Sequence, residues 1–111
     1  THSQQHKMLE PFVANLVGEG LQCRGLFAHG VTMTVVQWTI AAGAKLPEHA
    51  HPHEQVSHVL EGEFEMTIDG QSERLGPGAL AIVPPNVTHS GRAVTECRII
   101  DVFHPVRADY R

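Results

Sequence analysis

Three histidines alternate within five residues of the chain, at His49, His51 and His53. Side chains two residues apart share one face of an extended strand, and Gln55 continues the series. Imidazoles held close together repel one another when protonated, whereas neutral imidazoles are good ligands for a divalent transition metal. Completing such a site requires a ligand from elsewhere, and His89, which follows a proline-rich turn, is the best placed. The pattern therefore predicts a metal site.

The other histidines have less specific interpretations. His2 and His6 lie near the start of the chain and His29 precedes an expected turn, so we expect all three to be solvated. His58 alternates away from the metal-facing series, and substrate contact and plain packing are both open for it. His53 follows a proline, where a bulge would turn it off the metal face and make it a rim residue or a donor to a ligand.

The elements that must position these residues have the pattern of strands and turns from about residue 21 onward. Residues 33–40 are β-branched and aromatic, and residues 63–68 alternate charged and apolar side chains before the hairpin signal Asp69-Gly70. Helical periodicity is open only around residues 9–17. Many short strands separated by Gly and Pro turns predict an all-β fold, an antiparallel sandwich or small barrel whose interior can hold a ligand.

Length and composition fit one folded domain. The chain has 111 residues, of which 41% are hydrophobic and 18% charged, which is enough apolar material for one core. We therefore treat residues 1–111 as a single domain with residues 1–8 as a flexible tail. Cys23 and Cys97 lack CxxC spacing, so we expect two reduced, buried thiols.

Charge and hydropathy exclude several classes of partner. The net charge is −4 and no basic run is present, which argues against nucleic acid. No stretch approaches the roughly 18 consecutive apolar residues of a membrane span, and the start lacks the apolar segment of a signal peptide. We therefore expect no membrane partner and a cytoplasmic location. Small barrels expose edge strands that gain from pairing, so we expect a homodimer.

Two spaced motifs resemble those of the cupin family. Residues 43–62 resemble the first motif, with His49-Ala50-His51 followed by Gln55 where most cupins carry Glu. Residues 78–89 resemble the second, with Asn86 where Gly is usual. The resemblance implies a double-stranded β-helix, which is an antiparallel jelly-roll barrel.

The same resemblance implies one metal ion in the barrel, with His49, His51, Gln55 and His89 as its ligands. A neutral Gln55 leaves the charge of the ion uncompensated, which makes it a stronger Lewis acid and anion binder. A carboxylate substrate would suit such a site. Three imidazoles and an amide oxygen fit Ni, Mn, Fe, Co or Zn, and the ligand types do not choose among them.

A closer resemblance covers most of the chain, from residue 18 onward, and is carried above all by residues 101–109. It is to the small pectin-degradation cupins, which convert 4,5-unsaturated uronates, the products of polysaccharide lyases, into linear keto sugars. In that family an Asp, a Phe and an Arg line the pocket beside the metal, and the matching residues are Asp101, Phe103 and Arg107. The chain departs from this family at His58, where we expect Tyr, and at His104, which is often Ser.

The residues themselves allow two interpretations of this segment. Asp101 and Phe103 share one face of a strand, and Arg107 follows a proline. At a barrel mouth the three would supply a proton carrier, a stacking wall and a fork for a carboxylate, with substrate contacts from Arg107, Phe103 and His58. Alternatively, Phe103 belongs to the core and Asp101 forms a surface ion pair with Arg107.

Two other functions are open. One is a cupin dioxygenase or lyase acting on a small organic acid, although Gln55 argues mildly against oxygen chemistry because a carboxylate ligand helps to stabilise oxidised iron. The other is a non-catalytic module that binds a sugar or an acid. In either case we expect a small-molecule ligand.

Overall fold

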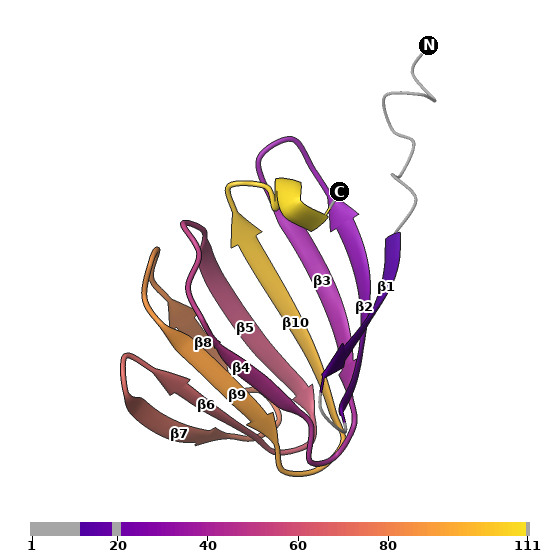
Figure 1. The fold of residues 1–111 in the computed structure, drawn as a ribbon, viewed down its shortest axis with the longest axis vertical. Helices are drawn as coiled ribbons and strands as arrows, with labels where there is room; N and C mark the ends of the chain where they lie inside the picture. Colours follow the sequence, from indigo (N-terminus) through magenta and orange to yellow (C-terminus); the bar gives the residue numbers. More distant parts are fainter. Residues whose placement is uncertain (1–11, 19–20, 111) are drawn as a thin grey trace.

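The computed structural model describes residues 12–18 and 21–110, which form an all-β, antiparallel fold with one short 3₁₀ helix (Figure 1). The expected all-β, antiparallel class is therefore confirmed. The expected flexible tail, with His2 and His6, lies outside the described residues. In chain order the elements are β1 (Phe12–Gly18), β2 (Leu21–His29), β3 (Thr34–Ile40), β4 (Lys45–His49), β5 (Glu54–Glu61), β6 (Phe64–Ile68), β7 (Gln71–Leu75), β8 (Leu80–Val83), β9 (His89–Ala93), β10 (Cys97–His104) and η1 (Ala108–Tyr110).

The strands form two sheets, of six strands in the order β1-β2-β3-β10-β5-β8 and four strands in the order β4-β9-β6-β7. β10 lies between β3 and β5, which places a late segment of the chain at the centre of the larger sheet (Figure 1). β4 pairs with β9, and His49 lies opposite His89 in this pairing. The sheet topology thus joins the two motifs singled out in the sequence.

Alternation of side chains places the core between the sheets. Along β3 and β10 every second residue is buried, as expected for strands with one face on a core and the other toward solvent. The buried apolar residues come from both sheets and include Phe27, Val36, Trp38, Ile40, Val59, Phe64, Met66, Ile99 and Phe103. The same alternation directs a second set of side chains, which are polar, toward the interior.

Local turn chemistry follows the sequence in the described residues. Asp69 and Gly70 both have positive φ, of 50° and 79°, as a two-residue hairpin turn between β6 and β7 requires.

Cys23 and Cys97 are free, buried thiols, as expected, and burial raises the pKa of each. Residues 12–18 form a strand that pairs with β2, so the helical option is wrong there. No helix of the described residues is long and apolar enough to cross a membrane.

Two glycines of the first motif provide a matched test of backbone strain. Gly62 and Gly43 have almost equal φ values, of 86° and 84°. A Cβ at Gly62 would strike the carbonyl oxygen of Glu96, whereas a Cβ at Gly43 would meet no atom within 4 Å. Gly43→Ala should therefore cost only the left-handed conformation, about 1–2 kcal/mol. Gly62→Ala should cost about 1–3 kcal/mol more, measured by urea unfolding. Equal losses in the two variants would show that the space around Gly62 is not limiting.

Candidate metal centre and cavity

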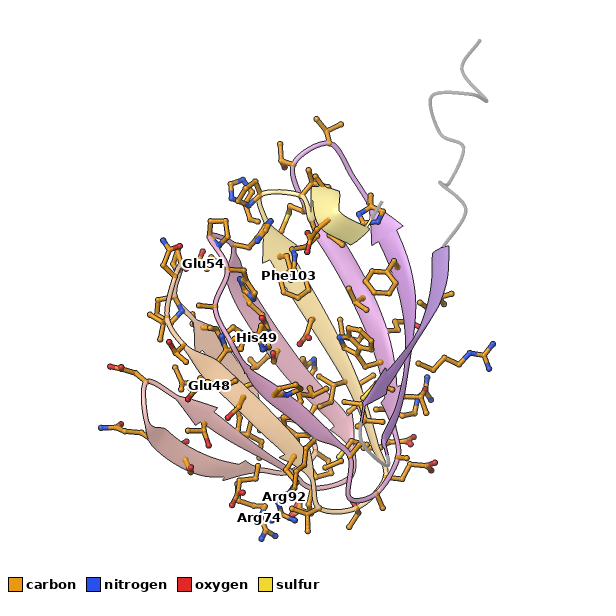
Figure 2. All side chains as sticks on the ribbon, in the orientation of Figure 1. Glu48, His49, Glu54, Arg74, Arg92 and Phe103 are labelled. Atoms are coloured by element: carbon orange, nitrogen blue, oxygen red, sulfur yellow. The ribbon has the colours of Figure 1, made fainter. Side chains whose placement is uncertain are left out.

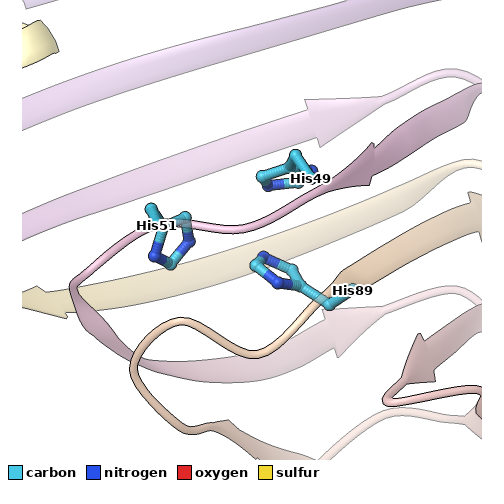
Figure 3. Close-up of side chains that lie close together, drawn as sticks. All are labelled: His49, His51 and His89. Atoms are coloured by element: carbon cyan, nitrogen blue, oxygen red, sulfur yellow. The ribbon is translucent and has the colours of Figure 1, made fainter.

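Three histidines from two strands and a loop converge inside the barrel (Figure 3). His49 ends β4, His51 follows in the loop and His89 begins β9. One ligand nitrogen of each lies within 4.8 Å of the others. The ring centroid of His89 lies 4.2 Å from that of His49 and 4.8 Å from that of His51. The structure thus brings together three of the four residues for which the sequence predicts metal binding in one three-histidine cluster.

Backbone carbonyls fix the tautomer of each ring. Nδ1 of His49 lies 2.8 Å from the carbonyl oxygen of Pro47 and Nδ1 of His89 lies 2.9 Å from that of Val87. Nδ1 of His51 lies 3.1 Å from the carbonyl oxygen of His53. A carbonyl only accepts, so Nδ1 of each ring carries the proton and donates it. Each neutral ring therefore keeps a lone pair on Nε2, the arrangement that orients histidine for a metal.

The lone pairs of the two buried histidines, His51 and His89, lack donors, whereas the third, His49, is exposed. Nε2 of His89 is buried without a hydrogen-bond partner, and Nε2 of His51 lies 3.1 Å from the side-chain oxygen of Gln55, which is also an acceptor. Burial, and then the charge of Arg107, lowers the pKa of His51, and burial lowers the pKa of His89. Both rings therefore stay neutral near neutral pH. A cation would satisfy these converging acceptors, so the residues fit a divalent metal.

A buried hydrogen-bond chain leads away from the cluster. Nε2 of Gln55 donates to Oγ of Ser57 (2.9 Å), and the Ser57 hydroxyl donates to Oδ1 of Asp101 (2.6 Å). Nε1 of Trp38 donates to the other oxygen, Oδ2, of Asp101 (2.9 Å). Burial raises the pKa of Asp101 to about 6, against the opposing effect of the bonds from Ser57 and Trp38. Asp101 is thus a carboxyl group that two hydrogen bonds fix in place and that can gain and lose a proton near neutral pH.

Arg107 and Phe103 lie beside this chain. The guanidinium carbon of Arg107 is 4.7 Å from the centroid of the Phe103 ring, and the side chain is buried. Its Nε and Nη2 donate to the two carboxylate oxygens of Asp109, at 3.0 and 2.7 Å, and this bond lowers the pKa of Asp109. The backbone N–H of Arg107 donates to Oγ1 of Thr34 (2.8 Å). Arg107 therefore forms an ion pair with Asp109, and Asp101 is buried and not at the surface, unlike the surface pair considered from the sequence.

These groups surround one cavity of about 260 Å³, which we call the histidine cavity. Two of its lining residues, His49 and Phe103, are labelled in Figure 2, well above Arg74 and Arg92 at the lower end of the barrel. The polar lining of the histidine cavity comprises His49, Gln55, Ser57, His89, Ser90, Asp101 and Arg107, and its apolar lining includes Trp38, Ile40, Leu46, Phe64, Met66, Ile99 and Phe103. A few polar groups converging in a mostly apolar cavity are typical of a small-molecule site.

The remaining histidines have different positions. His58 lies on the outer face of β5, opposite Ile100 and Leu80, and it does not line the histidine cavity. The geometry therefore gives no support to the expected substrate contact of His58, because Ser57 occupies the inward position. His104 is exposed. His29, which was expected to be a solvated turn residue, is the last residue of β2 and is half-buried. Its Nδ1 lies 2.9 Å from Oγ1 of Thr34.

His53 is half-buried, with its ring centroid 5.4 Å from that of His51. Its carbonyl accepts the Nδ1 proton of His51, so its backbone supports a candidate ligand. Sequence reasoning missed Trp38, Ser57 and Asp109 as partners of the site residues. The signal for Ser57 was its position two residues after Gln55, and the signal for Asp109 was its position two residues after Arg107.

The fold and the site define a small antiparallel β-barrel with a candidate metal centre at an internal cavity. Residues 36–103, more than half of the chain, match the family model described as "Cupin domain". The chain belongs to the cupin family, which confirms the resemblance of its two motifs.

Two proteins with assigned functions are similar to this chain in sequence. The chain is 29% identical over 92 residues to the pectin degradation protein KdgF of Dickeya dadantii, covering 73% of this chain and 84% of that protein. It is 36% identical over 78 residues to the dimethylsulfoniopropionate lyase DddQ of Ruegeria pomeroyi, which covers 69% of this chain but only 36% of that longer protein. The small cupin that the sequence predicts, resembling the pectin-degradation proteins, is therefore confirmed.

Solved structures agree with this assignment. An RmlC-like cupin from Shewanella frigidimarina superimposes with a TM-score of 0.79 at 34% identity, over 92% of this chain and 90% of that chain. KdgF from a Halomonas species superimposes with a TM-score of 0.75 at 29% identity, over 96% of this chain and 92% of that chain. Both cover nearly the whole barrel, so the fold is that of a cupin.

The buried carboxyl of Asp101 predicts a pH dependence of stability. Its pKa of about 6 is above the 3.8 of an exposed Asp, so the folded state binds the proton more tightly. The stability from this proton is complete below about pH 4 and is lost as the pH rises through about 6. At about 1.36 kcal/mol per pKa unit, the loss is roughly 3 kcal/mol.

Chelator-treated wild-type protein and Asp101→Asn can be compared by urea unfolding across this range. The unfolding free energy of the wild type should fall with rising pH relative to that of Asp101→Asn. Histidine titration is common to both proteins and cancels in the difference. Parallel curves would mean that Asp101 titrates as an ordinary carboxyl.

Proposed function

We propose that this protein is a metal-dependent enzyme that converts 4,5-unsaturated uronates to linear 5-keto sugars by ring opening and ketonisation. The observation that carries the proposal is that Asp101, Phe103 and Arg107 line one cavity with two members of the three-histidine cluster, His49 and His89. The likeness to two proteins named KdgF supports it, as does the resemblance of residues 101–109.

Asp101 is the proposed proton carrier. The substrate is a cyclic enol ether with a hemiacetal hydroxyl at C1. Asp101 takes the proton of that hydroxyl, C1 becomes a carbonyl carbon, and the bond from C1 to the ring oxygen breaks. The electron pair leaves an enolate at C5, beside the substrate carboxylate. Return of a proton to C4 then gives the C5 ketone. A carboxyl with a pKa of about 6 can serve in both directions.

Arg107 and Phe103 position the substrate. The buried guanidinium of Arg107 is oriented by Asp109 and by the Phe103 ring, so it can hold a carboxylate without reorganising. Phe103 offers a flat apolar surface to a sugar ring. His58, on the outer face of the sheet, has no part in this arrangement.

The proposed ligands of a divalent transition metal are His49, His51, His89 and Gln55. When bound, such a cation supplies positive charge next to the oxygens on which negative charge develops, which is the differential stabilisation that accelerates a reaction. Gln55 is uncharged, so the protein ligands leave that positive charge available to an anionic substrate. Ni, Mn, Fe, Co and Zn all suit these ligands.

The test uses the unsaturated monouronate that exhaustive digestion of oligouronides with a polysaccharide lyase releases, because its C1 carries the free hemiacetal hydroxyl that the reaction requires. Purified wild-type protein loaded with each metal in turn should consume the ultraviolet absorbance of the unsaturated uronate without taking up oxygen. Asp101→Asn should lose at least about a hundredfold in kcat, because general acid–base catalysis contributes at least that much. Its metal content, measured by elemental analysis, should be unchanged.

The same assay separates the competing functions. Full activity of Asp101→Asn would remove this residue from the mechanism. Consumption of oxygen would indicate a dioxygenase. Tight binding of the unsaturated uronate with no chemical change would indicate a non-catalytic module.

A second candidate is a lyase that acts on a small organic acid, which the 36% identity to DddQ favours. The same groups suit it, since a cavity carboxyl can remove a proton adjacent to a carboxylate that Arg107 holds. Incubation with dimethylsulfoniopropionate and detection of dimethyl sulfide in the headspace distinguishes this lyase from the uronate enzyme.

We also propose that the protein is a homodimer that packs through the outer face of the six-stranded sheet. One row across five neighbouring strands is entirely apolar and consists of Ala28, Val35, Val102, Val56 and Ile82. The next row contains Leu26, Gln37, Ile100, His58 and Leu80. Leu80 and Ile82 are 64% and 61% exposed, which is unusual for apolar side chains on adjoining positions.

A second copy of this chain suits that face. Arg24 and Arg98 lie beyond one end of the two rows, where Glu61 pairs with Arg98 at 4.0 Å, and Glu54 lies beyond the other. Two copies packed face to face with antiparallel strands would therefore bring the Glu54 end of one over the arginine end of the other. Face-to-face packing of sheets requires apolar faces on both sides, and an identical copy supplies one.

Light scattering coupled to gel filtration tests the dimer. Wild-type protein should elute with twice the mass of one chain, and Ile82→Lys should weaken association about tenfold or more because it buries a charge at the interface. Val31→Lys is the control, since Val31 is 93% exposed in the turn between β2 and β3. A monomeric wild type, or an Ile82→Lys variant that dissociates on dilution no more readily than the wild type, would contradict this interface.

A further inference from the structure

Gln55 poses a problem of orientation that a glutamate would not. The two carboxylate atoms of Glu are both oxygens, so either presents an acceptor to a cation. An amide presents either an oxygen or an NH₂ group, and the NH₂ group cannot bind a metal. Use of Gln55 as a ligand therefore requires that another group decide which end of its amide faces the three-histidine cluster.

The hydrogen bonds around Ser57 have one direction. The Ser57 hydroxyl carries a single proton, which it donates to Oδ1 of Asp101 at 2.6 Å. Its oxygen can then only accept, and it accepts from Nε2 of Gln55 at 2.9 Å. The NH₂ group of Gln55 is thereby directed toward Ser57, and its oxygen is directed toward Nε2 of His51, at 3.1 Å.

Burial strengthens this constraint. Gln55 is 5% exposed and Ser57 is 1% exposed, so the amide has no bulk water to replace the acceptor that Ser57 provides. Both residues lie on the inner face of β5, and Ser57 is directly opposite Asp101 on β10. Trp38 donates to Oδ2 of Asp101, and the other oxygen, Oδ1, is the one that accepts the Ser57 proton.

We propose that Ser57 is a positioning residue that fixes the amide of Gln55 so that its oxygen, and not its NH₂ group, faces the cation site. The inference rests on the metal site proposed above and extends it to a residue that is not itself a ligand. It also accounts for how this chain uses Gln at a position where most cupins carry Glu. The serine compensates for the asymmetry of the amide.

A double-mutant cycle tests the inference with Zn²⁺ as the probe. The full chain is stripped with chelator, and the Kd for Zn²⁺ is measured by competition with a chromogenic chelator. Ser57→Ala should weaken Zn²⁺ binding about ten- to hundredfold when residue 55 is Gln, the usual effect of removing a group that orients a ligand. In a Gln55→Glu background the same change should weaken binding less than about threefold, because either carboxylate oxygen can serve.

Two controls separate this role from a general structural one. Loss of the bond from Ser57 to Asp101 occurs in both backgrounds and cancels in the cycle. Trp38→Phe removes a donor from Asp101 without touching Gln55, and it should leave the Kd for Zn²⁺ within about threefold. Ser57→Cys, whose thiol is a weak hydrogen-bond partner, should change the affinity in the same direction as Ser57→Ala and replaces it if that variant does not fold.

The outcomes are distinct. Equal losses of Zn²⁺ affinity in the wild-type and Gln55→Glu backgrounds, or no loss in either, would overturn the role of Ser57 while leaving the metal site in place. A wild-type chain that binds neither Zn²⁺ nor any of the other candidate metals would contradict the metal site itself.

Discussion

The site depends on acceptor atoms that converge without donors. Each of three imidazoles gives its Nδ1 proton to a backbone carbonyl two residues away in the chain, which leaves the Nε2 lone pairs directed inward. The oxygen of Gln55 adds a fourth acceptor. The buried acceptors among them, on His51, His89 and Gln55, are costly unless a positive charge lies nearby, and burial disfavours the protons on His51 and His89 that would otherwise supply it. The local backbone therefore prepares the cavity for a cation before any ligand is present.

The strand pairings convert this local arrangement into a reactive cavity. Pairing of β4 with β9 sets His49 opposite His89, and pairing of β5 with β10 sets Gln55 opposite Phe103 and Ser57 opposite Asp101. A shift of either register by one residue would turn the site residues of the shifted strand to the outer face. The apolar core is thus also the device that aligns the polar groups, because burial of residues such as Val59 and Ile99 specifies the register.

Much of this was predictable from the residues alone. The spacing of His49, His51 and His89 predicted the cluster, and alternation with Gly and Pro turns predicted the all-β class. Partnerships across strands were not predictable, because the bond from Ser57 to Asp101 and the bond from Trp38 depend on a register that no short window contains. Residues 12–18 are a strand because β2 offers a partner edge, a tertiary effect that outweighs local preference.

The central place of β10 in the larger sheet has a consequence for synthesis on the ribosome. β3 and β5 are separated by the position that β10 fills, and β10 is made after both of them. While translation proceeds at about 5–20 residues per second, β3 and β5 lack the strand that pairs with both of them. The cavity cannot form until β10 has been inserted between them. The nascent chain therefore exposes the apolar residues of β3 and β5 until almost the whole chain has been synthesised.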